Sequence, residues 1–296
     1  MKQRVPGRRF APMPSLPYFR HTRRAPSGLV GEVVRESWTM QAERCRTAVE
    51  AVLPDSALEV YFNLGPAGRH LGCRQHSTPR TPRRAWIVGP HDQPLLIEKE
   101  IRDCDVVGIR FHAGAAKQVL GVPAREVHAA MVDLDVFWGR EVECIRDQLA
   151  ATSDPTARLT IIECAVASRM TRSGDCNVSA PRTLSRMVGT SVHESIGAIA
   201  VRMGLSHRQL IAIFDEWVGL KPKAFQRVQR LRRVFRLVDA SPRPSWTSIA
   251  HRSGYFDQAH MINDFRSLTG VTPSEYAATH SSVGEGFIPY RLAPAD

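Results

Sequence analysis

The sequence predicts an α+β protein with a β-rich first part and an all-helical second part. Residues 27–170 hold short runs rich in Val, Ile, Phe and Tyr between Gly and Pro turn residues, the texture of a small sheet or barrel. Beyond residue 182, apolar residues recur three and four positions apart, which indicates helices. A chain of 296 residues is long enough for two domains with separate cores.

The β-rich part is predicted from four strand-like runs and two helical patterns. The runs lie at 56–65, 84–90, 94–101 and 104–112, and the helical patterns at 133–151 and 155–170. Composition then divides the whole chain into a basic, Pro/Arg-rich mobile arm (1–26), a β-rich domain ending in two helices (27–170), a linker (171–182), an all-helical domain (183–280) and a flexible tail (281–296).

The net charge of +11 is concentrated in two segments of the chain. Residues 1–26 carry +7 and residues 182–280 carry +7, whereas the remainder is close to neutral at −3. A solvated basic surface needs no partner, but this concentration favours a polyanionic one.

No segment is expected to cross a membrane or to direct export. The longest apolar stretches, such as 51–62, are interrupted well before the roughly 18 residues that a span needs. Arg8 and Arg9 are not followed by the apolar core of an export signal, so we expect a cytoplasmic, nucleoid-associated protein. Six cysteines without a Cys-x-x-Cys pair are expected to be reduced.

The helical part contains one unit twice. Ile-Ala, three residues and Gly occur at 199–204 and again at 249–254. The pattern Phe-x4-Gly-x2-Pro-x2-aromatic then occurs at 214–225 and again at 265–276. The offset grows from 50 to 51 residues, which places one inserted residue in the second turn. Such self-similarity indicates one supersecondary unit used twice.

The sequence predicts a helix, a turn and a second helix in each unit. In the first, Gly204 supplies a tight turn and Ser206 caps the following helix. Gly219 ends that helix, and Pro222 starts the next at a position where its missing N–H costs nothing. This arrangement places a second helix in a DNA major groove, and two copies joined by an Arg-rich helix (225–240) are far more specific than one.

These residues resemble the DNA-binding module of the AraC/XylS family of bacterial transcription regulators. The matching positions are Ser206, Leu210, Phe214, Gly219, Pro222, Arg230, Leu231, Ile249, Ala250, Gly254, Tyr255, Phe265, Arg266, Gly270, Pro273 and Tyr276. The resemblance implies a double helix-turn-helix whose lobes enter successive major grooves. Residues 52–65, 108–127 and 133–139 are similar to the sensor-like domain that precedes this module in one subgroup. That likeness implies a domain that binds an effector, dimerises, or both.

Counting 100° per residue separates a core side from a DNA side on each recognition helix. The core sides are Leu210, Ile213, Phe214 and Trp217 in the first lobe, and Met261, Phe265 and Leu268 in the second. The residues predicted to contact DNA are Arg208, Ile211, Ala212, Lys221, Lys223, Arg230, Gln258, Ala259, His260, Asn263 and Arg266.

Individual DNA roles follow from side-chain chemistry. Asn263 pairs with adenine, Arg266 suits a phosphate, and Ile211 and Ala212 suit thymine methyl groups. Asp215 and Glu216 also project on the predicted DNA side, so we expect the first lobe to bind DNA more weakly than the second. Relatives commonly carry Arg in place of Ala212 and Asn263, so the resemblance implies a different target sequence. Plain solvated surface is the alternative for each exposed position.

The partners implied are double-stranded DNA, a small-molecule effector, RNA polymerase and a second copy of the chain. We expect no enzyme activity, no cofactor and no metal, because signatures of a serine nucleophile or a phosphate-binding Gly loop are missing. One alternative is a metal-binding, cupin-like enzyme domain fused to a DNA-binding module, with ligands among His70, Cys73, His76, His91 and His112. The first three lie in a loop-like stretch, however, and a cupin His-x-His followed by Glu is absent. The other alternative is a non-specific nucleic-acid packaging protein.

Overall fold

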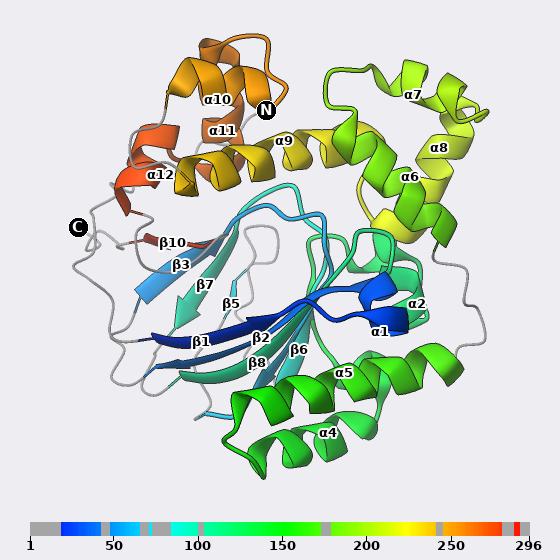
Figure 1. Cartoon of the computed structure of the whole chain (residues 1–296), viewed down its shortest axis with the longest axis vertical. Helices are drawn as coiled ribbons and strands as arrows, with labels where there is room; N and C mark the ends of the chain where they lie inside the picture. Colours follow the sequence, from blue (N-terminus) through cyan, green and yellow to red (C-terminus); the bar gives the residue numbers. More distant parts are fainter. Residues whose placement is uncertain are drawn as a thin grey trace.

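Two antiparallel sheets and a bundle of helices make up the described chain (Figure 1). The computed structural model describes residues 19–42, 48–65, 71–72, 84–99, 104–172, 179–240, 245–279 and 287–290. The six-stranded sheet has the order β1 (Phe19–Arg24), β2 (Val34–Ala42), β8 (Cys104–Phe111), β4 (Glu59–Asn63), β6 (Ala85–Val88) and β9 (Met131–Asp133). The four-stranded sheet has the order β10 (Phe287–Tyr290), β3 (Ala48–Val52), β7 (Leu95–Lys99) and β5 (Leu71–Gly72).

The middle strands of the six-stranded sheet are buried on both faces. On β4, Val60 and Phe62 point to the face that helices cover, and both are fully buried. Because successive strand side chains point to opposite faces, Glu59 and Tyr61 lie on the other face. There Tyr61 packs with Trp38 and Trp86 in a second hydrophobic cluster, the aromatic cluster, which also includes Val52 and Leu95 of the smaller sheet.

Helices pack on the first face of the six-stranded sheet. They are α1 (Gly28–Val33), α2 (Ala116–Leu120), the 3-10 turn η1 (Ala124–Val127), α3 (Asp135–Trp138), α4 (Glu141–Ala150) and α5 (Pro155–Arg172). The single helix predicted over 133–151 is two helices, because Gly139 has a φ of 60° and breaks the pattern between α3 and α4.

The C-terminal helices form two lobes around one long shared helix. They are α6 (Ser179–Thr190), α7 (Ile196–Arg202), α8 (His207–Ile213), the π turn η2 (Phe214–Val218), α9 (Pro222–Asp239), α10 (Trp246–Arg252), α11 (Gln258–Thr269) and α12 (Pro273–Thr279). The start of α9 contributes Phe225 and Val228 to the first-lobe core, and its later turns contribute Leu231 and Phe235 to the second. In Figure 1, α9 runs between the second lobe and the sheets, and its start lies beside α6 of the first lobe.

The predicted α+β class, with a β-rich N-terminal domain and an all-α double helix-turn-helix domain, is confirmed. The strand-like runs at 56–65, 84–90, 94–101 and 104–112 contain β4, β6, β7 and β8. No helix among the described residues is both long enough and apolar enough to span a membrane.

Three of the expected irregular segments contain regular structure. The expected arm ends in β1, which pairs with β2 along its whole length; residues 1–18 lie outside the described part. The expected tail contains β10, which pairs with β3 and so satisfies a strand edge that would otherwise be open. The expected linker is partly helical, because α5 continues to Arg172 and α6 begins at Ser179.

Candidate nucleic-acid interface

The second helix-turn-helix unit, α10 and α11, is built as its sequence predicts. Ser245 caps α10 by accepting from Ser248 N at 3.5 Å, and Asp257 caps α11 by accepting from His260 N at 2.7 Å. Met261 and Phe265 are fully buried in the second-lobe core. The carboxylate of Asp257 therefore accepts a hydrogen bond from one of the backbone N–H groups that have no partner within the first turn of α11.

The opposite side of α11 carries four exposed side chains from the predicted DNA-facing set. These are Ala259, His260, Asn263 and Arg266. Gln258 is half-buried, and its Oε1 accepts a hydrogen bond from Thr247 of α10 at 3.2 Å. Because Asn263 is exposed, its amide is available for bidentate pairing with a base edge.

The first unit, α7 and α8, is capped by Ser195 and Ser206 and has a shorter second helix. Ser206 and Gln209 form a reciprocal capping box, with bonds of 3.2 Å and 2.8 Å. Leu210 is fully buried, whereas Arg208 and Ala212 are exposed. Ile211, also predicted to face DNA, is half-buried.

The placement of Glu216 on the DNA side is wrong. Helix α8 gives way to the π turn η2, in which Gly219 N donates to Phe214 O at 2.9 Å, so a constant 100° per residue no longer holds there. Glu216 pairs instead with Lys117 of α2 in the N-terminal domain. The Lys117 ammonium also lies 4.7 Å from the ring centroid of Trp217, which is half-buried rather than core.

The basic residues of α9 and the turn before it have different environments. Lys221 and Lys223 are exposed at the start of α9. Arg230, predicted to contact DNA, is half-buried with its guanidinium 5.0 Å from the ring centroid of Tyr255. Arg227 pairs with Asp264 of α11, which ties α9 to the recognition helix of the second lobe.

Tyr255 anchors the turn between α10 and α11. Its hydroxyl donates to Asp264 Oδ2 at 3.1 Å, and burial together with that carboxylate raises the pKa of Tyr255 well above its usual range. The next residue, Phe256, is 85% exposed and was not among the predicted DNA-facing residues. The sequence signal for it is the inserted residue in the second turn, since Gly204 is followed by Leu205 and the cap, whereas Gly254 is followed by Tyr255, Phe256 and the cap.

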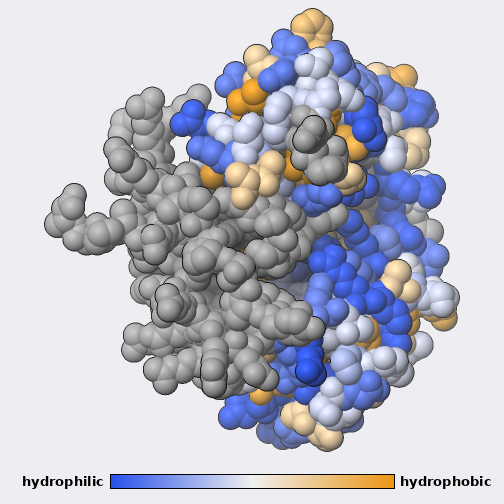
Figure 2. Space-filling model, turned by 60° about the vertical axis from the view of Figure 1, so that its left-hand side comes forward, coloured by the Kyte–Doolittle hydropathy of each residue, from blue (hydrophilic) through white to orange (hydrophobic). Residues whose placement is uncertain are grey.

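Described hydrophobic residues on the face that Figure 2 shows are scattered among hydrophilic ones, including over the upper part of the molecule where the second lobe lies.

The histidines of the metal-site alternative have other partners where they are described. His91 is fully buried, with Nδ1 2.9 Å from Gly89 O and Nε2 3.1 Å from Leu53 O. His112 lies 3.5 Å from Arg182, and burial and that arginine lower the pKa of His112 to about 4. Within the described residues, no group of three or more His, Cys, Asp or Glu is arranged to hold a metal ion, and His70, Cys73 and His76 lie outside the described residues.

Comparison with protein families gives two matches. A family model described as "Helix-turn-helix domain" matches residues 199–279, which span both units from α7 to α12. This match shows a helix-turn-helix domain in the C-terminal part of the chain, where the sequence resembles the AraC-type double unit. A model described as "Domain of unknown function (DUF6597)" matches residues 22–133, which lie in the N-terminal domain. Comparison with curated proteins gave no match.

The fold of the chain, over both domains, also resembles solved structures. A crystal structure of the AraC-family regulator ToxT from Vibrio cholerae with a bound unsaturated fatty acid has a TM-score of 0.50 and 13% identity, covering 83% of this chain and 96% of that one. The apo form of a lysine-to-alanine variant of ToxT gives a TM-score of 0.50 and 12% identity, over 82% of this chain and 97% of that one. Both the matched family and these neighbours are transcription regulators rather than enzymes.

Proposed function

We propose that this protein is a sequence-specific transcriptional regulator whose two lobes read successive major grooves of one duplex. The observation that carries the proposal is the pair of capped helix-turn-helix units on a shared α9, each presenting exposed side chains on its second helix. We propose that Arg208, Ile211 and Ala212 contact DNA in the first lobe. Ala259, His260, Asn263 and Arg266 do so in the second, and Lys221 and Lys223 contact phosphates.

The N-terminal domain is proposed to bind a small-molecule effector. Its tryptophans provide the readout, because Trp86 stacks on Tyr61 with ring centroids 5.4 Å apart and Trp38 meets Tyr61 edge-on at 5.6 Å. The similar fold of ToxT is known with a bound unsaturated fatty acid, which makes a fatty acid the first ligand to test. A change in tryptophan fluorescence together with altered DNA affinity on addition of oleate would support this assignment, and absence of both would oppose it.

Selection of binding sites from random duplex DNA tests the DNA-reading proposal. We expect an enriched motif with two half-sites about one helical turn, or about 10 base pairs, apart. A packaging protein would instead bind all sequences alike. Recovery of no enriched motif would overturn the proposal.

Asn263→Ala then assigns one base pair of that motif. Loss of a bidentate amide contact should reduce discrimination at a single position by about 1–3 kcal/mol and leave the other positions unchanged. The matched control is Gln148→Ala, an exposed amide on α4, which Figure 1 shows on the far side of the sheets from α11. Equal changes in both variants would contradict a base contact by Asn263.

A further inference from the structure

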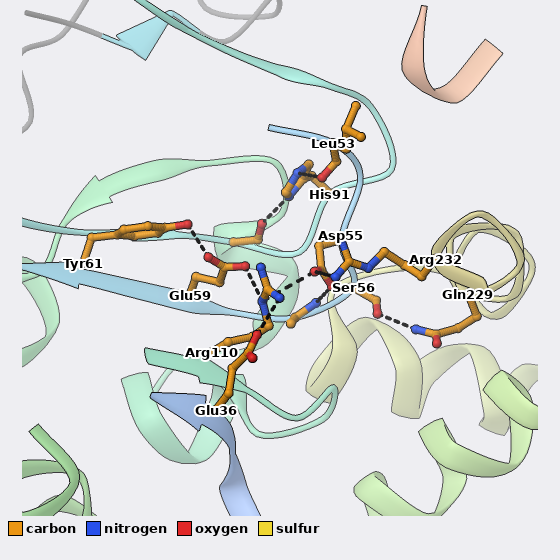
Figure 3. A network of polar contacts seen from close by, with 12 residues as sticks. Glu36, Leu53, Asp55, Ser56, Glu59, Tyr61, His91, Arg110, Gln229 and Arg232 are labelled. Carbon is orange, nitrogen blue, oxygen red and sulfur yellow. Dashed lines mark hydrogen bonds and ion pairs between the residues drawn. The ribbon is translucent and has the colours of Figure 1, made fainter. Parts of the chain in front are cut away.

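A buried polar network runs from the aromatic cluster of the N-terminal domain to α9 of the DNA-binding domain (Figure 3). It begins at Tyr61, whose hydroxyl donates to Glu59 Oε2. Glu59 Oε1 accepts from Arg110 Nε at 2.6 Å, and Arg110 Nη1 donates to Glu36 at 2.7 Å. Glu59 and Arg110 are both buried, so the contacts operate with little screening by solvent.

Asp55 lies where this network meets α9. Its Oδ2 is 3.7 Å from Arg110 Nε and 3.5 Å from Arg232 Nη2, and it accepts no hydrogen bond in the described structure. Its Oδ1 accepts from Ala57 N at 3.0 Å. Burial alone would raise the pKa of the Asp55 carboxyl, but Arg232 and Arg110 hold that pKa well below its usual range. One buried carboxylate is therefore shared by two guanidinium groups from different domains.

The residues on either side of Asp55 also reach the second lobe. Leu53 is fully buried and belongs to the second-lobe core, although it follows β3 of the N-terminal domain. Ser56 accepts a hydrogen bond from Gln229 of α9 at 2.7 Å. Residues 53–56 are thus a contact segment between the domains, and His91 N donates to Asp55 O at 2.7 Å to hold it in place.

The first lobe has its own attachment to the N-terminal domain. Lys117 pairs with Glu216 and lies over Trp217, as described above. Both lobes are therefore positioned against the same N-terminal body, one at η2 and the other at the contact segment. The exposed sides of α8 and α11 stay uncovered, so this docking restrains the lobes without blocking their DNA-facing residues.

We propose that Asp55 is a coupling residue through which the N-terminal domain sets the separation of the two DNA-reading lobes. This inference rests on the proposed function. Arg110 and Arg232 compete for the same carboxylate oxygen, so a change that frees Arg110 from Glu59 draws Asp55 toward Arg110 and loosens Arg232. Glu59 also accepts a hydrogen bond from the Tyr61 hydroxyl. A movement of Tyr61 within the aromatic cluster is therefore transmitted to Arg232 of α9 through the side chains of Glu59, Arg110 and Asp55.

The first measurement needs no DNA. Hydrogen exchange of the full-length protein is compared for the wild type and Asp55→Asn, a change that preserves side-chain shape and removes charge. We expect amides of α9 around Arg232 and of α10 to exchange about tenfold faster in the variant. The control is Asp105→Asn, which makes the same chemical change in an ion pair with Arg158 inside the N-terminal domain, at 2.7 Å. Unchanged exchange of α9 in Asp55→Asn would overturn the proposal.

The second measurement uses the selected DNA site. Inserting one base pair between the half-sites should weaken wild-type binding about tenfold or more, because it rotates and shifts one half-site relative to the other. In Asp55→Asn, that penalty should fall to about threefold or less, while Asp105→Asn keeps the wild-type penalty. An unchanged penalty in Asp55→Asn refutes the coupling, whereas failure to select any site refutes the proposed function and leaves the exchange result to decide the coupling.

Glu59→Gln provides a second variant in case Asp55→Asn does not fold. It keeps Asp55 and Arg232 but weakens the hold of Glu59 on Arg110. The expected result has the same sign, with faster exchange in α9 and a smaller spacing penalty. Slower exchange in α9 would contradict the competition between Arg110 and Arg232.

Discussion

At the scale of single residues, Phe256 is the side chain whose environment is least explained by the folded chain alone. It stands between the buried Tyr255 and the helix cap Asp257, so neighbours anchored on both sides keep its ring exposed. Leaving a phenylalanine in water forgoes about 1.5–3 kcal/mol of burial free energy. The ring also adjoins the first turn of α11, where the predicted base-reading residues begin.

We expect Phe256→Ala to weaken binding to the selected site about tenfold without lowering the thermal unfolding temperature, because the ring packs on DNA and not on the protein. Replacing single thymines by uracil in the site should locate the contact, since only a missing methyl group distinguishes the two duplexes. Leu29→Ala removes a 77% exposed apolar side chain from α1 and serves as the control. Equal affinity of Phe256→Ala and Leu29→Ala would exclude this contact.

At the scale of elements, the junction between η2 and α9 joins the first lobe to the N-terminal domain. Gly219 has a φ of +77°, and a Cβ built there would lie 2.7 Å from Ala124 O of η1. Gly204 has a φ of +66° with no atom within 4 Å of such a Cβ. Alanine substitution strains the backbone at both positions, but only at Gly219 does it also push the domains apart.

Gly204→Ala should therefore destabilise the protein by about 1–2 kcal/mol, the cost of a left-handed alanine. Gly219→Ala should cost more, by about 1–3 kcal/mol, because the clash is with backbone that cannot move away easily. Chemical denaturation of both variants measures the difference. If the two substitutions destabilise equally, the close approach of Gly219 to Ala124 does not hold in solution.

These same elements show what sequence can and cannot predict. The Ser206 cap can be predicted from the sequence because capping depends on atoms three residues away. The π turn and the Lys117–Glu216 pair were missed, since they depend on a contact between residues 99 positions apart. Strand β2 was missed because Ser37 and Thr39, both buried, give it a polar composition that masks its alternation.

The candidate site divides in the same way. The exposed face of α11 follows from helical periodicity, and Met261, Phe265 and Leu268 are buried as predicted. Arg232 carries no local sign that it pairs with Asp55, because its partner lies in the other domain and an Arg-rich helix beside a repeat suggests phosphate contact. Long-range ion pairs of this kind need the tertiary structure.

At the scale of the whole molecule, the contact segment makes the two domains one cooperative unit. Leu53 is 1% exposed and fills the second-lobe core from the N-terminal side. Unfolding of the N-terminal domain must therefore open that core, so calorimetry of the wild type should show a single transition.

Leu53→Ala should separate that transition into two. The substitution removes apolar contacts and leaves a cavity, at a cost of about 2–5 kcal/mol, in the second-lobe core, which Leu53 links to the N-terminal domain. We expect the second lobe to melt first and to become sensitive to proteolysis while the sheets stay folded. Leu58→Ala is the matched control, because Leu58 is equally buried but lies in the core of the N-terminal domain. It should lower the melting temperature without splitting the transition. A single transition in Leu53→Ala, lowered as in Leu58→Ala, would mean that cooperativity between the domains does not pass through the contact segment.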